Sequence, residues 1–192
     1  MSIFDKLKGT VSDVAKAARE AVGSGNQTET IVIGKLPESL EELKALPEAA
    51  MDTPFKTAAL TVCALCAYAA DKEIGISMLD FLRGPGGPLS AMEKQFLKDR
   101  FADEKFYVPF SYFEGATPEN EYAPAEPFTL KISSNPYSFQ NEGYATLWIR
   151  SGGADSPRQV DLRKAGTGVW YLRNHQGLTP DIRKPKSLDP WA

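Results

Sequence analysis

The segment PFKTAALTVCALCAYAA, residues 54–70, decides the fold, because it predicts one helix that is apolar on almost every side. Asp52 and Thr53 come just before it and supply capping side chains, and Pro54 suits the first helical turn. A helix of this composition is typical of the centre of a domain. We therefore expect residues 54–70 to be the buried element around which the rest of the chain packs.

Shorter helices are predicted on both sides of this segment, within a helical part that covers residues 36–102. Leucines three and four residues apart indicate one helix between residues 36 and 46. Leu79 and Leu82 indicate a second helix over residues 73–83. Ser90 and Glu93 form a capping-box pattern at the start of a third helix. The glycine- and proline-rich residues 84–88 predict the turn between the last two helices.

The apolar pattern changes after the helices. Residues 106–113 are rich in aromatic side chains and predict extended structure, and the proline-containing residues 114–127 predict an exposed acidic loop. Residues 128–175 then hold four segments with a period of two, and residues 30–33 add a possible short strand. The predicted fold class is therefore α+β, with N-terminal helices packed on a C-terminal antiparallel sheet of about four to five strands.

The same patterns predict one domain with an appendage. Residues 31–192 form a single α+β domain, whose proline-rich last part, residues 176–192, is expected to run over the surface. Residues 1–22 predict an amphipathic helix, and residues 23–30 predict a linker. The stripe of this helix is formed by Phe4, Leu7, Val11 and Val14. It could pack on its own domain, bind a protein partner, or drive self-association through residues 3–22, and the sequence leaves these alternatives open.

Composition and charge argue against several classes of protein. No apolar run is long enough to cross a bilayer, so no transmembrane segment is expected. Charged residues near the start and only two cysteines favour a cytoplasmic location over secretion. The net charge is −3, and the mildly basic residues 128–192 contain no contiguous basic block. Nucleic acid is therefore not the expected partner.

No motif identifies a catalytic centre, a cofactor site or a metal site. Cys63 and Cys66 match the C-x-x-C pattern, but they lie inside the predicted apolar helix, where core packing is the better interpretation. His175 is the only histidine, and we interpret it as a solvated residue in a turn. The turn at residues 84–88 lacks the lysine and hydroxyl of a phosphate-binding loop. We expect no catalytic residue, cofactor or metal ligand, and we favour a protein that is not an enzyme.

Arginine and aromatic side chains share the polar face of the predicted sheet. The residues on this face are Tyr144, Trp148, Arg150, Arg163, Tyr171 and Arg173. Such a mixture suits a protein interface or stacking on nucleic-acid bases, and a covered sheet face with arginine stems over aromatic rings would give the same pattern. The residues predicted to bind a partner are Trp148, Arg150, Tyr171 and Arg173, together with the four stripe residues of the N-terminal helix.

Five short segments carry a resemblance to a known family. They are SMLDFLRGP at 77–85, KQFLKDRF at 94–101, VWYL at 169–172, DIRKP at 181–185 and DPW at 189–191. On these segments, most of residues 28–192 resembles an uncharacterised bacterial family, found mostly in anaerobic gut Firmicutes and known only as a domain of unknown function. The resemblance implies a bacterial cytosolic protein, and it implies no activity, ligand or catalytic residue.

Three functions follow from these observations, in order of preference. The first is a non-enzymatic protein-binding or scaffolding module that uses its N-terminal helix or its arginine and aromatic sheet face. The second is a small-molecule-binding protein or enzyme with a pocket between helices and sheet, near His175. The third is a protein that binds single-stranded nucleic acid on the sheet.

Overall fold

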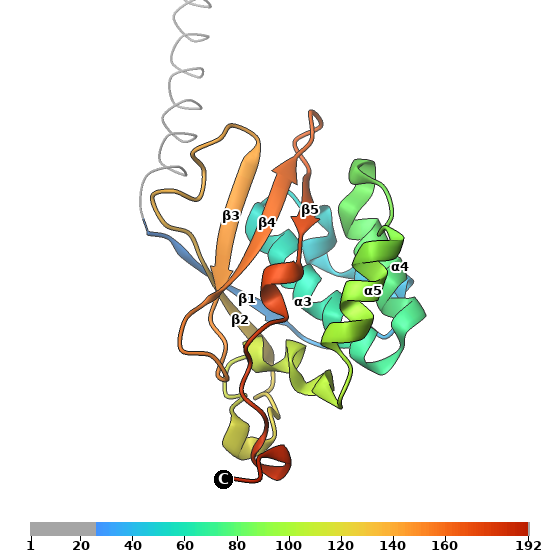
Figure 1. The fold of residues 1–192 in the computed structure, drawn as a ribbon. Coiled ribbons are helices and arrows are strands. Elements are labelled where there is room, and N and C mark those ends of the chain that lie inside the picture. The colour runs from blue at the N-terminus through green and yellow to red at the C-terminus, as the bar shows by residue number, and fades with distance from the viewer. Residues whose placement is uncertain (1–25, 192) are drawn as a thin grey trace, which may run out of the picture.

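The computed structural model describes residues 26–191, and the predicted apolar helix lies at its centre (Figure 1). Helix α3 runs from Pro54 to Ala70, as predicted, and the Thr53 side chain caps it by accepting a hydrogen bond from the backbone N–H of Lys56. Nearly every side chain of α3 is buried. The buried hydroxyl of Thr57 donates a hydrogen bond to the carbonyl oxygen of Trp170, so even the polar positions of the helix are satisfied.

An antiparallel sheet packs with one face on α3. Within residues 26–191 its order is β1–β2–β3–β4–β5, and all neighbouring strands are antiparallel. The strands are β1 (Thr28–Ile33), β2 (Phe128–Ser133), β3 (Tyr144–Ile149), β4 (Arg158–Lys164) and β5 (Trp170–Asn174). Alternate strand residues, including Leu130, Leu147 and Leu162, are fully buried in the core. The predicted α+β fold class is therefore confirmed.

Strands β2 and β3 pair over a short distance only. β1 pairs with β2 at six positions and β3 with β4 at six, whereas β2 and β3 share two paired positions, at Ile132 and Ser133 of β2. The connecting residues 134–143 fold back on β3, where the Ser138 carbonyl accepts a hydrogen bond from the Thr146 N–H at 3.0 Å. The sheet thus consists of two ladders that both contact α3.

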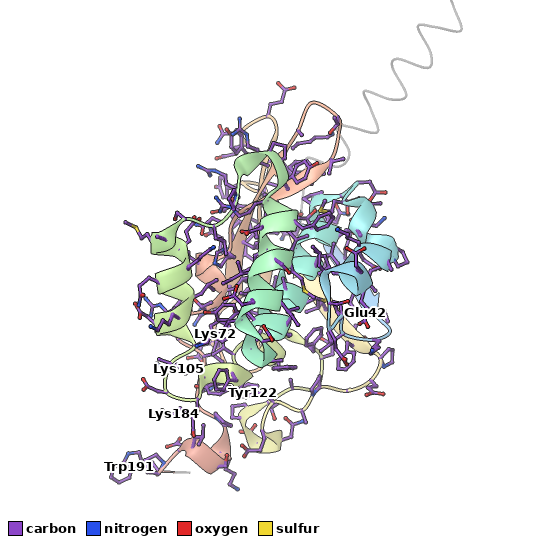
Figure 2. All side chains as sticks on the ribbon, turned by 90° about the vertical axis from the view of Figure 1, so that its right-hand side faces the viewer. Glu42, Lys72, Lys105, Tyr122, Lys184 and Trp191 are labelled. Atoms are coloured by element: carbon purple, nitrogen blue, oxygen red, sulfur yellow. The ribbon has the colours of Figure 1, made fainter. Side chains whose placement is uncertain are left out.

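Within residues 26–191, the helical layer also contains three shorter helices, α2 (Leu40–Ala45), α4 (Lys72–Arg83) and α5 (Ala91–Arg100). Figure 2 views the molecule from this helical side. Helix α4 follows α3 directly, because Asp71 ends α3 and its carboxylate accepts hydrogen bonds from the first turn of α4. Residues 84–86 form a short 3-10 turn after α4, and the predicted turn between α4 and α5 is therefore confirmed.

Two predictions about irregular segments are wrong. Residues 106–113 are not extended, because 3-10 turns occupy Lys105–Tyr107 and Pro109–Tyr112. Pro109 cannot donate a ladder hydrogen bond, and the buried aromatic side chains that suggested a strand instead fill the core beneath these turns. The predicted linker also extends too far, because β1 begins at Thr28 and pairs there with Ser133.

The acidic loop is largely exposed, but a few buried side chains anchor it and the tail. Tyr122 of the loop is buried and stacks on Tyr107, with ring centroids 5.3 Å apart. Its hydroxyl donates a hydrogen bond to the Arg183 carbonyl at 2.7 Å, and Leu178 and Ile182 of the tail are buried. The loop and the tail therefore hold each other against the lower end of the molecule in Figure 1.

The capping box of α5 provides a test of local stability. Ser90 Oγ accepts a hydrogen bond from the Glu93 N–H, and the Glu93 carboxylate accepts one from the Ser90 N–H at 2.8 Å. We expect Ser90→Ala to lower the free energy of unfolding by about 1 kcal/mol in urea denaturation. Met92, in the same turn, is 81% exposed, so Met92→Ala is the control and should change stability by less than about 0.5 kcal/mol. Equal losses in the two variants would contradict the capping role.

Candidate functional site

The structure divides the predicted partner-binding residues into three groups. Phe4, Leu7, Val11 and Val14 lie outside the described residues. Trp148 lies near the end of β3 and Arg150 directly follows the strand, remote from Tyr144, its first residue. Tyr171 and Arg173 lie on β5, the last strand of the sheet. The sheet face is therefore not one continuous site.

A row of side chains crosses the other end of the sheet. Tyr144 of β3 pairs with Arg163 of β4, which in turn pairs with Tyr171 of β5. The turn after α4 lies against the end of this row, because a β-carbon at Gly84 would be only 2.2 Å from the Tyr171 ring. Gly84 also has a positive φ of 47°, which favours glycine. This glycine lets a helical turn and the edge strand approach closely.

A surface pocket of about 540 Å³ opens between this turn and the β4–β5 hairpin. Its walls include Pro85 and Gly86 of the turn and Tyr171 of the strand. Four cationic residues line it: Arg83, Arg163, Lys164 and Arg173. Of the described residues that line it, none is acidic. We call this site the cationic pocket.

Arg83 is held in place at the end of α4. Its Nε donates a hydrogen bond to the Gly87 carbonyl, and its Nη1 donates one to the Glu93 carboxylate, both at 2.8 Å. Partial burial raises the pKa of Glu93, but hydrogen bonds from Ser90 and the charge of Arg83 outweigh it and lower that pKa overall. These two bonds use two of the five N–H donors of the guanidinium, so Arg83 is a positioned cation with donors to spare.

The other three cations rest on aromatic rings. The guanidinium carbons of Arg163 and Arg173 lie 5.4 and 5.3 Å from the centroid of the Tyr144 ring. The ammonium of Lys164 lies 5.6 Å from the Trp170 ring. Within residues 26–191, none of the three cations forms a salt bridge with a carboxylate. The rings therefore hold together a cluster of positive charge whose members form no ion pair with the described carboxylates.

The two cysteines belong to the core, as the sequence predicts. Both are buried in α3, and burial raises the pKa of the Cys63 thiol to about 12 and that of Cys66 well above its usual value. A protonated, inaccessible thiol cannot act as a nucleophile or redox group. Across the part of the chain that the structure describes, no group of three or more His, Cys, Asp or Glu side chains could hold a metal ion.

His175 is buried, so the prediction that it is solvated is wrong. The residue is 1% exposed, and neither ring nitrogen has a hydrogen-bond partner among the described residues. Burial lowers the pKa of His175 to about 4, with the charge of Glu93 opposing and that of Arg83 adding to the shift. The ring is thus neutral at pH 7. His175 lies near the Arg83–Glu93 pair but does not line the cationic pocket.

Two of the four cationic residues of the pocket, Arg163 and Arg173, were predicted from the sequence to share one sheet face. The alternating pattern of the strands placed Arg163 and Arg173 on one face, but it gave no reason to add Arg83 from a helix about 80 residues earlier. Lys164 was also missed, because the residue after Arg163 is expected to point to the opposite face of the sheet. Lys164 ends β4 beside the hairpin turn, so the residue borders the pocket although its ammonium lies over the Trp170 ring.

The fold and this site define an α+β domain with a cationic pocket at the edge of its antiparallel sheet. The chain belongs to the family described as domain of unknown function DUF6935, whose model matches residues 35–186. Membership of a domain-of-unknown-function family, which the resemblance implied, is thereby confirmed. No curated protein and no solved structure matches the chain. Between residues 26 and 191, no helix is long and apolar enough to cross a bilayer.

Proposed function

We propose that this protein is a non-enzymatic binding protein whose cationic pocket holds a phosphate-type dianion of a small ligand. The convergence of four cationic side chains on a pocket without an acidic lining residue, among those described, carries this proposal. Like charges this close repel one another, and an anion between them replaces that repulsion with attraction. The pocket therefore favours an anionic group over a neutral or cationic one.

The charge of the pocket favours a dianion over a single carboxylate. Glu93 already balances Arg83, which leaves the charges of Arg163, Lys164 and Arg173 to be neutralised. A phosphate monoester carries a charge of about −1.5 to −2 at neutral pH and offers three acceptor oxygens. Guanidinium groups bind such oxygens through paired hydrogen bonds. Three uncompensated cations thus suit a phosphate better than a carboxylate.

The size of the pocket favours a small ligand over a protein partner at this site. Its volume of about 540 Å³ falls within the range of roughly 300–1,000 Å³ that small-molecule sites occupy. Trp148 and Arg150, which were predicted to bind a partner, do not line it. Protein binding through these two residues, or through residues 3–22, stays a prediction. So does the cytoplasmic, bacterial setting, which is compatible with a phosphorylated ligand.

Removing two arginines tests the proposal. We expect Arg163→Gln combined with Arg173→Gln to weaken binding of inorganic phosphate more than tenfold, because each lost charge-assisted hydrogen bond contributes about 1.5–3 kcal/mol. Isothermal titration calorimetry at constant ionic strength measures the effect. Both side chains are exposed, so the double variant should keep its thermal unfolding midpoint.

The control for this experiment removes the same amount of charge elsewhere. Arg150 and Lys184 are exposed and lie outside the pocket, and Figure 2 shows Lys184 near the C-terminal tail. Arg150→Gln combined with Lys184→Gln should therefore change phosphate affinity less than twofold. If both double variants lose the same phosphate affinity, the loss is due to the change in net charge and not to the pocket. Phosphate that binds the parent protein no better than chloride does would refute the proposed function.

A further inference from the structure

A second pocket adjoins the cationic pocket on the outer face of the sheet. It has a volume of about 480 Å³, and its lining includes Tyr137, Gln140, Asn141 and Tyr144. We call it the polar pocket. Arg173 lines both pockets, and the Tyr144 ring of the polar pocket lies under the guanidinium groups of Arg163 and Arg173. A single ligand held at Arg173 can therefore extend into both.

The wall of the polar pocket is fixed to the sheet. It is formed by residues 135–143 of the β2–β3 connection, in which Ser138 is buried and its Oγ accepts a hydrogen bond from the Asn135 N–H at 2.9 Å. The backbone of this segment also accepts hydrogen bonds from Thr146 of β3 and, through the Gly143 carbonyl, from Lys164 of β4 at 2.8 Å. The side chains of the wall are thus presented from a positioned segment.

The chemistry of the polar pocket suits hydroxyl groups. The side-chain amides of Gln140 and Asn141 are exposed, and neither has a hydrogen-bond partner among residues 26–191, so their donors and acceptors are available to a ligand. The ring of Tyr137 is 69% exposed and offers an apolar surface at the rim. Amide groups beside an exposed aromatic ring match a sugar, whose hydroxyls form hydrogen bonds and whose C–H faces are apolar.

A neighbouring carboxylate makes the polar pocket a poor place for a second anion. Asp161 lies beneath it, where its Oδ1 accepts a hydrogen bond from Thr146 Oγ1 at 2.9 Å. Gln159 also donates to this oxygen, so the carboxylate is fixed on the same sheet face. Repulsion from Asp161 disfavours a second phosphate there. The two pockets thus differ in kind, one for a dianion and one for an uncharged polar group.

We infer that the ligand is a phosphorylated sugar, with its phosphate in the cationic pocket and its hydroxyl-bearing ring in the polar pocket. This inference rests on the proposed function and names the class of ligand. Arg173, at the junction, contacts the phosphate from one side and the sugar from the other. A nucleotide contains the same unit, so the shared chemistry is a sugar phosphate, either free or as part of a nucleotide.

Titration calorimetry with four probes tests this inference on the full chain. At constant ionic strength, ribose 5-phosphate should bind at least tenfold more tightly than inorganic phosphate, and ribose alone should bind too weakly to measure. Gln140→Ala combined with Asn141→Ala should weaken ribose 5-phosphate about tenfold and inorganic phosphate less than twofold, because about two neutral hydrogen bonds are lost. Gln95→Ala, which removes an exposed amide from α5, is the control and should affect neither probe.

The fourth probe is adenosine monophosphate. Its affinity relative to ribose 5-phosphate distinguishes a nucleotide from a free sugar phosphate. Adenosine monophosphate that binds more tightly than ribose 5-phosphate assigns the sugar phosphate to a nucleotide, and the reverse order assigns it to a free sugar phosphate. Both orders support the shared chemistry. Ribose 5-phosphate that binds no better than inorganic phosphate overturns the sugar inference and leaves the phosphate site standing. Absence of phosphate binding in every titration overturns the proposed function itself.

Discussion

Gly75→Ala is expected to lower the free energy of unfolding by about 3 kcal/mol, although alanine is the better helix former. In an exposed helix this change would stabilise by about 1 kcal/mol. Gly75, however, lies in the first turns of α4, where the helix packs on the end of α3. A β-carbon there would be 2.3 Å from Cα and Cβ of Tyr68. These atoms belong to α3 and cannot move away unless the two helices separate. The clash therefore outweighs the better helix propensity of alanine, and the substitution destabilises the protein.

Urea denaturation of two alanine variants measures this effect. Gly34 is the control, because a β-carbon at that position would have no atom within 4 Å and its φ is not positive. Gly34→Ala should leave stability unchanged or raise it by less than about 1 kcal/mol. If the two variants unfold at the same urea concentration, the close packing of α3 and α4 at Gly75 is not what limits this position.

The second large expected effect is a loss of stability at acidic pH that is caused by the buried His175. The pKa of His175 is about 4 in the folded protein, against its ordinary value of 6.5. Between these values the unfolded chain binds a proton that the folded protein does not bind. The contribution of His175 to stability is therefore fully present above pH 6.5 and is lost as the pH falls towards 4. Two and a half pKa units correspond to a loss of about 3 kcal/mol between pH 7 and pH 4.

Replacing the His175 ring by an apolar side chain separates its contribution to the pH dependence of stability from that of the carboxylates, which titrate in the same pH range. His175→Leu should be less sensitive to acid than the parent protein by about 3 kcal/mol, measured as the difference in unfolding free energy at pH 7 and pH 4. Because His175 is the only histidine in the chain, its NMR signal can also be titrated directly. Parallel pH profiles for the two proteins, or a midpoint near 6.5, would show that the ring is solvated.

The regular elements were predictable because their signals are local. The apolar composition of residues 54–70, bounded by Thr53 and Asp71, fixed both ends of α3 correctly. Alternating residues likewise located β2 to β5, and the Ser90–Glu93 pattern located α5. In each case, neighbours in the sequence determine the hydrogen bonds and the buried face, so a window of a few residues contains the information.

The site was less predictable because its parts meet only in the folded chain. The position of His175 after a strand suggested a turn, and nothing local shows that the residue is buried or that the charges of Glu93 and Arg83 act on its ring. The joining of Arg83 to the arginines of β4 and β5 depends on how α4 crosses the sheet edge. Alternation ranked Trp148 and Arg150 equally with Tyr171 and Arg173, since the period of a strand shows which face a residue occupies but not which end forms a pocket.

The short pairing between β2 and β3 has a consequence for how this family could diversify. Residues 135–143 form the wall of the polar pocket, and they follow the point where β2 and β3 share only two paired positions. An insertion or deletion in this segment would therefore remove few interstrand bonds, and α3 would still hold both halves of the sheet through side-chain packing. Arg163 would keep its pairing with Tyr171 in the β4–β5 hairpin. If the proposed ligand binds here, its preference can thus change with residues 135–143, while the cationic residues of the β4–β5 hairpin stay in place.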